Sequence, residues 1–225
     1  MTQTPDSHQT EDTQSRPPVA GVLLAGGLSR RMGGTDKALL ELSGRPMLAH
    51  VRDRLVSQVD ALALNANGDP ERFAEFGLPV IADPIEGFIG PLAGILAGMR
   101  WAKEALSGAR WVVSAACDTP FFPTDLVDRF VDAVDGNEGI IALGKSGEQV
   151  QPVFGLWPVA LADDLETWLR SGKTNKVLAW VDQHRRVDVS FDSPVVGGVV
   201  RDPFFNANTP QDMETAAAVL AELAS

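Results

Sequence analysis

The residue types best suited to chemistry gather in one loop, residues 24–37, with the sequence LAGGLSRRMGGTDK. An apolar run, residues 19–24, leads into this loop and predicts a strand that ends where the loop begins. Gly26 and Gly27 would let the backbone come close to a ligand. Three cations of the loop could meet phosphate charge: Arg30, Arg31 and Lys37. The combination of backbone amides and cations after a strand predicts a site for a nucleoside triphosphate.

This loop matches neither of the two common phosphate-binding patterns. Its glycines fit neither the Walker spacing with its Lys-Ser/Thr pair nor the dinucleotide fingerprint: Gly26, Gly27, Gly33 and Gly34. A glycine-rich turn with solvated arginines would explain the glycine pair alone. The additional arginines and the Asp36-Lys37 pair, so soon after a strand, favour the phosphate site.

Three further polar residues end or follow apolar runs: Asn65, Asp83 and Asp118. Short apolar runs alternate with helical patterns through the first two thirds of the chain, which predicts an α/β fold with a mostly parallel central sheet and helices on both faces. In such a sheet, ligands bind beyond the carboxyl ends of the strands. We therefore expect the loop and these three residues to converge along one edge of the sheet.

Asp118 ends the run WVVSAACD, and the following Thr119-Pro120 pair blocks continuation as a helix. Mg²⁺ takes hard oxygen ligands and often uses one or two carboxylates together with substrate phosphates. Asp118 is therefore the predicted metal ligand, with a simple turn cap as the alternative. Asp83 precedes Pro84, and Asp-Pro is also a frequent turn pair. Asn65 offers a donor and an acceptor for a base or ribose, although it could merely end its strand.

The segment GPLAG, residues 90–94, places Gly90 and Pro91 before a predicted helix and Gly94 in its first turn. The free amide groups of a helix start suit an anionic ligand. An ordinary helix start with small residues for packing has the same sequence features.

The segment FFNANTPQD, residues 204–212, predicts a helix with Thr209 as its N-cap and Pro210 at the first position. Capping does not explain Asn206 and Asn208, which become candidate ligand contacts. Gln151 and the segment GKTNK, residues 172–176, could help to bind a substrate phosphate, but each by itself is typical of a solvated loop.

Composition limits the class of protein. The 225 residues carry a net charge of −11, which opposes binding to nucleic acid or to anionic lipid. No apolar run approaches the length of a membrane span, so we expect no membrane partner. The polar segment 1–17 is predicted to be a disordered tail, with residues 18–225 as a single domain. The single cysteine, Cys117, is expected in the core and fits a cytoplasmic location.

The order of these motifs resembles that of molybdenum cofactor guanylyltransferases, the molybdopterin guanine dinucleotide synthase family. The similarity covers residues from about 19 to 223. It implies a Rossmann-like, GT-A-like nucleotidyltransferase fold of three αβα layers. It also implies a nucleotide site formed by Leu24, Ala25, Gly26, Gly27, Lys37, Asn65, Asp83, Gly90, Gly94 and Asp118.

The same resemblance implies the reaction and its remaining residues. The family transfers GMP from Mg-GTP to the terminal phosphate of Mo-molybdopterin and releases pyrophosphate. Arg31, Lys37 and Asp118 would be catalytic, with Mg²⁺ on Asp118 as cofactor. Contacts to the pterin substrate would come from Gln151, Asn206 and Asn208. A molybdenum-insertion protein and molybdoenzyme apoproteins or their chaperones are the implied protein partners.

Two alternatives remain open from the residues. A cytidylyltransferase acting on molybdopterin, or a sugar-1-phosphate nucleotidyltransferase, would share the fold, although the sugar enzymes usually carry Pro-Lys where this chain has Asp36-Lys37. A protein of another class, a carrier that binds GTP and pterin without catalysis, would bind both ligands and release no pyrophosphate.

Overall fold

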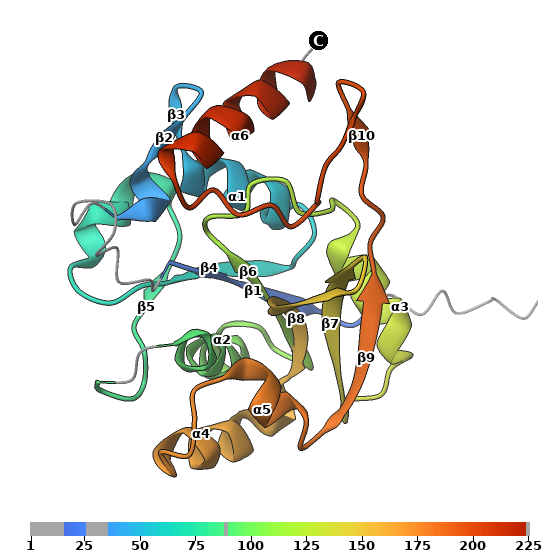
Figure 1. The fold of residues 1–225 in the computed structure, drawn as a ribbon. Helices are drawn as coiled ribbons and strands as arrows, with labels where there is room; N and C mark the ends of the chain where they lie inside the picture. Colours follow the sequence, from blue (N-terminus) through green and yellow to red (C-terminus); the bar gives the residue numbers. More distant parts are fainter. Residues whose placement is uncertain (1–15, 26–35, 88–89, 224–225) are drawn as a thin grey trace, which may run out of the picture.

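The structure, a computed structural model, describes residues 16–25, 36–87 and 90–223. Figure 1 shows a central sheet with helices packed on both of its faces. The predicted loop residues Gly26, Gly27, Arg30, Arg31, Gly33 and Gly34 lie outside the described residues.

Seven strands form the central sheet in the order β5-β4-β1-β6-β8-β7-β9. Strand β8 is antiparallel to its neighbours β6 and β7, whereas the other neighbouring pairs are parallel. This confirms the predicted mostly parallel sheet. The strands are β1 (Val19–Leu24), β4 (Ala61–Asn65), β5 (Val80–Ile81), β6 (Trp111–Ala116), β7 (Ile140–Ser146), β8 (Gln149–Pro158) and β9 (Arg185–Ser190).

Helices cover the two faces because the side chains of each strand alternate between them. In β6, Trp111 and Val113 pack with one buried cluster, and Val112 packs with another. The first cluster includes α1 (Met47–Val56) and α3 (Leu126–Val134). The second includes α2 (Pro91–Ala105), α4 (Ala162–Arg170) and α5 (Val177–Val181). The predicted three-layer αβα architecture is confirmed (Figure 1).

The remaining elements lie around the edges of the sheet. Three short 3₁₀ helices are η1 (Lys37–Leu39), η2 (Pro70–Phe76) and η3 (Val159–Leu161). Two small hairpins pair β2 (Glu41–Leu42) with β3 (Arg45–Pro46), and β10 (Val195–Val196) with β11 (Val199–Val200). Helix α6 (Pro210–Leu223) begins as predicted, because the Thr209 hydroxyl accepts from the Asp212 N–H at 3.1 Å.

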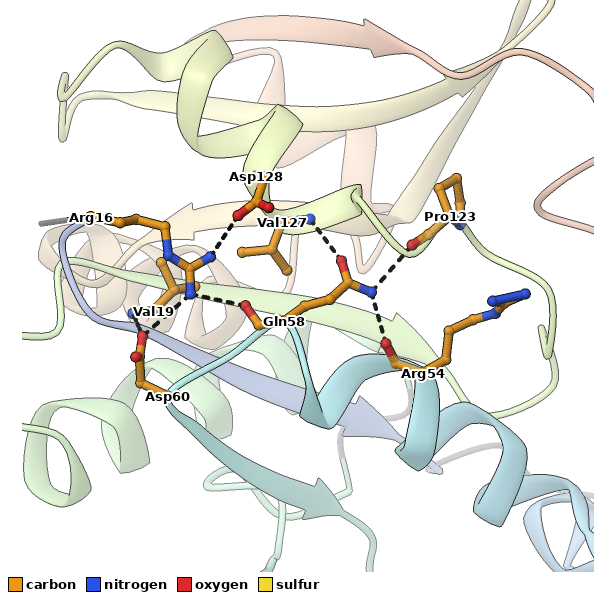
Figure 2. Close-up of polar contacts among 8 residues, drawn as sticks. All are labelled: Arg16, Val19, Arg54, Gln58, Asp60, Pro123, Val127 and Asp128. Atoms are coloured by element: carbon orange, nitrogen blue, oxygen red, sulfur yellow. Dashed lines mark hydrogen bonds and ion pairs between the residues drawn. The ribbon is translucent and has the colours of Figure 1, made fainter.

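A buried glutamine joins α1 to the start of α3 (Figure 2). The side-chain amide of Gln58 donates to the carbonyl oxygens of Arg54 at 2.8 Å and Pro123 at 3.2 Å. Its Oε1 accepts from the Val127 N–H at 3.1 Å, one of the helix N-terminal donors that has no partner within the helix. Gln58 therefore fixes the end of the segment that follows β6 and carries Asp118.

The described end of the predicted N-terminal tail is anchored to the same region (Figure 2). The Arg16 guanidinium donates to the carbonyl oxygen of Gln58 at 3.0 Å and pairs with Asp128 at 3.1 Å. It also lies 3.6 Å from Asp60, whose carboxylate accepts from the Val19 N–H. These contacts hold the entry into β1.

In the described part of the chain, no helix is both long and apolar enough to cross a membrane.

Replacing Gln58 with leucine should destabilise the fold. The substitution leaves the Val127 N–H buried without a partner, so we expect the free energy of unfolding to fall by about 1–3 kcal/mol. Urea denaturation followed by circular dichroism measures this change. The matched control is Gln183→Leu at an exposed position, for which we expect a change within about 0.5 kcal/mol. Equal effects of the two substitutions would contradict a role for the Gln58 hydrogen bonds.

Candidate nucleotide-binding site

A cavity of about 360 Å³ opens at the carboxyl edge of the sheet, where the parallel strands β1, β4, β5 and β6 end. Segments that are far apart in the sequence meet here. The lining residues are Leu24, Ala25, Lys37, Ala38, Asn65, Asp83, Gly90, Pro91, Ala116, Cys117, Asp118, Gln151, Pro152, Val153, Phe154, Asn206 and Asn208. The predicted convergence at one sheet edge is therefore present among the described residues.

Backbone hydrogen bonds extend the sheet beyond the end of β1 and fix three loops. The Ala25 N–H donates to the carbonyl oxygen of Asn65 at 2.9 Å, and the Cys117 N–H donates to that of Leu24 at 3.2 Å. The start of the glycine-rich loop, the end of β4 and the segment carrying Asp118 consequently have fixed relative positions.

Asn65 is a buried positioning residue, with 2% of its surface exposed. Its side-chain amide donates to the carbonyl oxygen of Ile81 at 3.1 Å and to Oδ1 of Asp83 at 3.0 Å. Asn67 donates to Oδ2 of Asp83 at 2.7 Å and accepts from the Asp83 N–H at 2.9 Å. Both protons of the Asn65 amide are thus used within the protein, where one of them holds Asp83.

Gly94 explains how Asn65 fits against α2. A Cβ atom at Gly94 would lie 2.2 Å from Oδ1 of Asn65 and 2.7 Å from Cδ2 of Leu24. Gly94 does not line the cavity, whereas Gly90 at the start of α2 does. The structure therefore gives Gly94 a packing function beneath a site residue.

Lys37 connects the glycine-rich loop to the C-terminal segment of the site. Its Nζ donates to Oδ1 of Asn208 at 2.7 Å. The preceding residue, Asp36, caps η1 and pairs with Arg72 at 3.3 Å. Arg72 also donates to the carbonyl oxygen of Asn67. The ion pair occupies the Asp36 carboxylate, so Lys37 can face the cavity without an acidic partner among the described residues.

Asp118 has a largely buried carboxyl group. Burial raises the pKa of Asp118, and this effect is opposed by the nearby positive charge of Lys37 and by the Thr119 hydroxyl. That hydroxyl lies 3.3 Å from Oδ1 of Asp118 and 2.6 Å from Oδ1 of Asn206. Thr119, fully buried, therefore links the two segments that carry Asp118 and Asn206.

The donor set around Asp118 fits a divalent cation that is also held by substrate oxygens. A buried carboxylate whose ionised form is disfavoured would be stabilised by such a cation. No group of three or more His, Cys, Asp or Glu side chains capable of holding a metal occurs in the part of the chain that the structure describes.

Gln151 reaches the cavity because β8 runs antiparallel to β6. The start of β8 thereby lies at the edge where the parallel strands end. The Gln151 side chain is 8% exposed and forms no hydrogen bond with any described residue. It is available to a ligand.

The site contains most of the residues that the sequence predicts, and some that it does not. Arg31 falls outside the described residues, along with Gly26 and Gly27. Sequence reasoning missed Thr119, Asn67 and Arg72, although Thr119 stands next to the predicted metal ligand. Cys117 packs in the core as expected, and burial raises the pKa of its thiol well above the usual range.

The chain is similar to known proteins along most of its length. Residues 21–187 match the family described as the MobA-like NTP transferase domain. A molybdenum cofactor guanylyltransferase of Mesorhizobium japonicum is 47% identical over 207 residues, which cover 92% of this chain and 98% of the relative.

This chain belongs to the molybdenum cofactor guanylyltransferase family.

Membership of the guanylyltransferase family makes the protein a nucleotidyltransferase, and the solved structures share its fold. Molybdopterin-guanine dinucleotide biosynthesis protein A of Archaeoglobus fulgidus superimposes with a TM-score of 0.69 at 22% identity, covering 90% of this chain and 98% of that one. A Mycobacterium tuberculosis protein solved in complex with manganese gives a TM-score of 0.58 at 17% identity, covering 91% of this chain and 100% of that one.

Replacing Gly94 with alanine should impair nucleotide binding through Asn65. The added Cβ displaces the Asn65 side chain, which then holds Asp83 less well, so we expect the KM for the nucleotide to rise about tenfold. The control is Gly98→Ala, whose Cβ would meet Val22 at 2.8 Å and no residue of the cavity. Steady-state kinetics should show little change in KM for that variant. A similar KM rise in both would mean that general disturbance of α2 is responsible.

Proposed function

We propose that the protein transfers GMP from Mg-GTP to the terminal phosphate of Mo-molybdopterin, forming the guanine dinucleotide of the cofactor and pyrophosphate. The observation that carries the proposal is the single cavity in which Lys37, Asp83 and Asp118 meet, in a chain of the guanylyltransferase family. This cavity combines a phosphate-binding cation with a carboxylate suited to a metal.

The transfer requires no covalent enzyme intermediate. The terminal phosphate of the pterin substrate is already an anion and can act as the nucleophile at the α-phosphorus. The protein has to align two anions and reduce their repulsion. We assign this task to Lys37 and to Arg31.

Asp118 would hold the Mg²⁺ ion, and manganese in the Mycobacterium tuberculosis neighbour supports a divalent metal in this fold. When bound, the ion neutralises charge on the α-phosphate and on the leaving pyrophosphate. Thr119 would orient the Asp118 carboxyl group through its hydroxyl, which lies 3.3 Å from Oδ1 of Asp118.

The nucleotide would lie between the end of β1 and the start of α2, bordered by Leu24, Ala25, Gly90 and Asp83. Gly26 and Gly27 would supply amide groups to its phosphates. The pterin substrate would lie on the opposite side of the cavity, toward Gln151, Asn206 and Asn208.

We further propose the setting of this reaction. Residues 18–225 act as one nucleotidyltransferase domain in the cytoplasm, and residues 1–17 form an N-terminal tail whose described end, Arg16, contacts that domain. A molybdenum-insertion protein would deliver the pterin substrate, and apoproteins of molybdoenzymes or their chaperones would receive the product. Neither nucleic acid nor a membrane is a proposed partner, because the net charge is −11.

The first test is pyrophosphate release from each of the four nucleoside triphosphates with Mg²⁺, with and without the molybdopterin cofactor. We expect release only with GTP and the cofactor together. A preference for CTP would keep the reaction class and overturn the base assignment. Tight GTP binding without release would favour the non-catalytic carrier.

Two substitutions in the cavity test the proposed roles. Asp118→Ala should abolish most turnover, because it removes the metal ligand. Lys37→Met should lower kcat/KM, because it removes a charge that faces phosphate. The expected loss of transition-state stabilisation is about 2–4 kcal/mol. The control is Lys103→Met, an exposed lysine in the last turn of α2. Near-normal turnover of purified Asp118→Ala would refute the metal role.

A further inference from the structure

A second cavity, of about 250 Å³, lies between α6, the β10–β11 hairpin and the segment that follows β6. It shares no lining residue with the nucleotide cavity. Its lining includes Arg54, Val200, Arg201, Asp202, Phe205 and Leu223. The wall is mainly apolar, with a few charged groups, which is the usual composition of a small-molecule pocket.

Two arginines of this cavity have no acidic partner among the described residues. The Arg54 guanidinium uses its Nε to donate to the carbonyl oxygen of Pro120 at 3.2 Å, and its side chain extends away from Gln58 (Figure 2). Burial lowers the pKa of Arg54, because the charged form loses water. Arginine nevertheless stays protonated in proteins, so its charge remains in the cavity wall.

The Arg201 guanidinium has fewer hydrogen-bond partners than that of Arg54. Its Nε is buried with no hydrogen-bond partner, and its side chain forms no ion pair with any residue that the structure describes. A buried N–H group without a partner is costly and therefore uncommon in folded proteins. An acceptor supplied by a ligand would satisfy this group.

The one carboxylate of the lining does not neutralise the two arginines. Oδ1 of Asp202 accepts from the Phe204 N–H at 2.9 Å, and Asp202 forms no ion pair with Arg54 or Arg201 in the described structure. Two positive charges against one negative charge leave the wall net positive, although the whole chain carries −11. The cavity therefore favours an anion.

The mouth of the cavity is apolar. Val200 is 67% exposed and Leu223 is 54% exposed, and Val195, paired with Val200 across the hairpin, is 67% exposed. Exposed large apolar side chains that adjoin a pocket are typical of a binding surface. The anion that fits here therefore carries an apolar body.

We propose that this cavity binds a small amphipathic monoanion, an apolar group with a single carboxylate or sulfonate, through Arg54 and Arg201. The site is connected to the nucleotide cavity through the backbone. Arg54 holds the carbonyl oxygen of Pro120, two residues after Asp118, and Phe205 directly precedes Asn206. The ligand thus contacts the rear of both segments that supply the catalytic cavity.

The test uses two fluorescent probes that differ by one charge, anilinonaphthalene sulfonate and its uncharged counterpart phenylnaphthylamine. Titration of the full chain without substrates should give saturable binding of the sulfonate probe. Arg201→Gln should weaken that binding at least about tenfold, because it removes a charged hydrogen-bond donor. Arg54→Gln should act in the same direction. Arg170→Gln on α4, remote from the cavity, is the matched control and should leave the affinity unchanged.

The neutral probe should bind the original chain and the arginine variants equally. Thermal unfolding checks that each variant is folded, and Arg201→Gln keeps the test valid if loss of the Arg54–Pro120 contact disturbs the fold. The proposal is overturned if the sulfonate probe binds both arginine variants as tightly as the original chain, or if GTP displaces it competitively. Because no turnover is measured, this outcome is independent of the proposed transferase activity.

Discussion

The site depends on the hydrogen bonds at the carboxyl end of β1, which is paired on both sides by parallel strands. The Ala25 N–H bonds to Asn65 on one side, and the carbonyl oxygen of Leu24 accepts from Cys117 on the other. Parallel pairing gives neighbouring strands a common direction, so the polar residues that follow these strands lie at one edge of the sheet. The positions of Asp83 and Asp118 follow from this register.

Hydrogen bonds from polar side chains then fix loops that backbone pairing does not reach. Asn65 and Asn67 use their amides to hold Asp83, and Gln58 holds the segment after β6 from behind. Asn65 and Gln58 are buried, so their hydrogen bonds are not freely exchanged with water, whereas Asn67 is exposed. The rigidity of the site therefore comes from residues that need not contact a ligand.

Charge is distributed unevenly in this acidic chain. Lys37 faces the cavity because Arg72 occupies the neighbouring Asp36, which would otherwise compete for it. Burial raises the pKa of Asp118 because it disfavours the ionised carboxylate, and a bound cation would lower that pKa again. A net negative protein can thus present a local environment suited to a metal and phosphates.

The sequence by itself determined the local features: the alternation of short apolar runs with helical patterns that gives the α/β fold, the Thr209 cap of α6 and the polar residues at strand ends. These depend on periodicity and on contacts between near neighbours. It did not determine the reversed direction of β8, which brings Gln151 to the cavity, nor the packing of Gly94 against Asn65. The roles of Thr119 and Arg72 could not be predicted from the sequence either. Each of these features joins segments distant in the chain, and only the packed tertiary structure decides which of them meet.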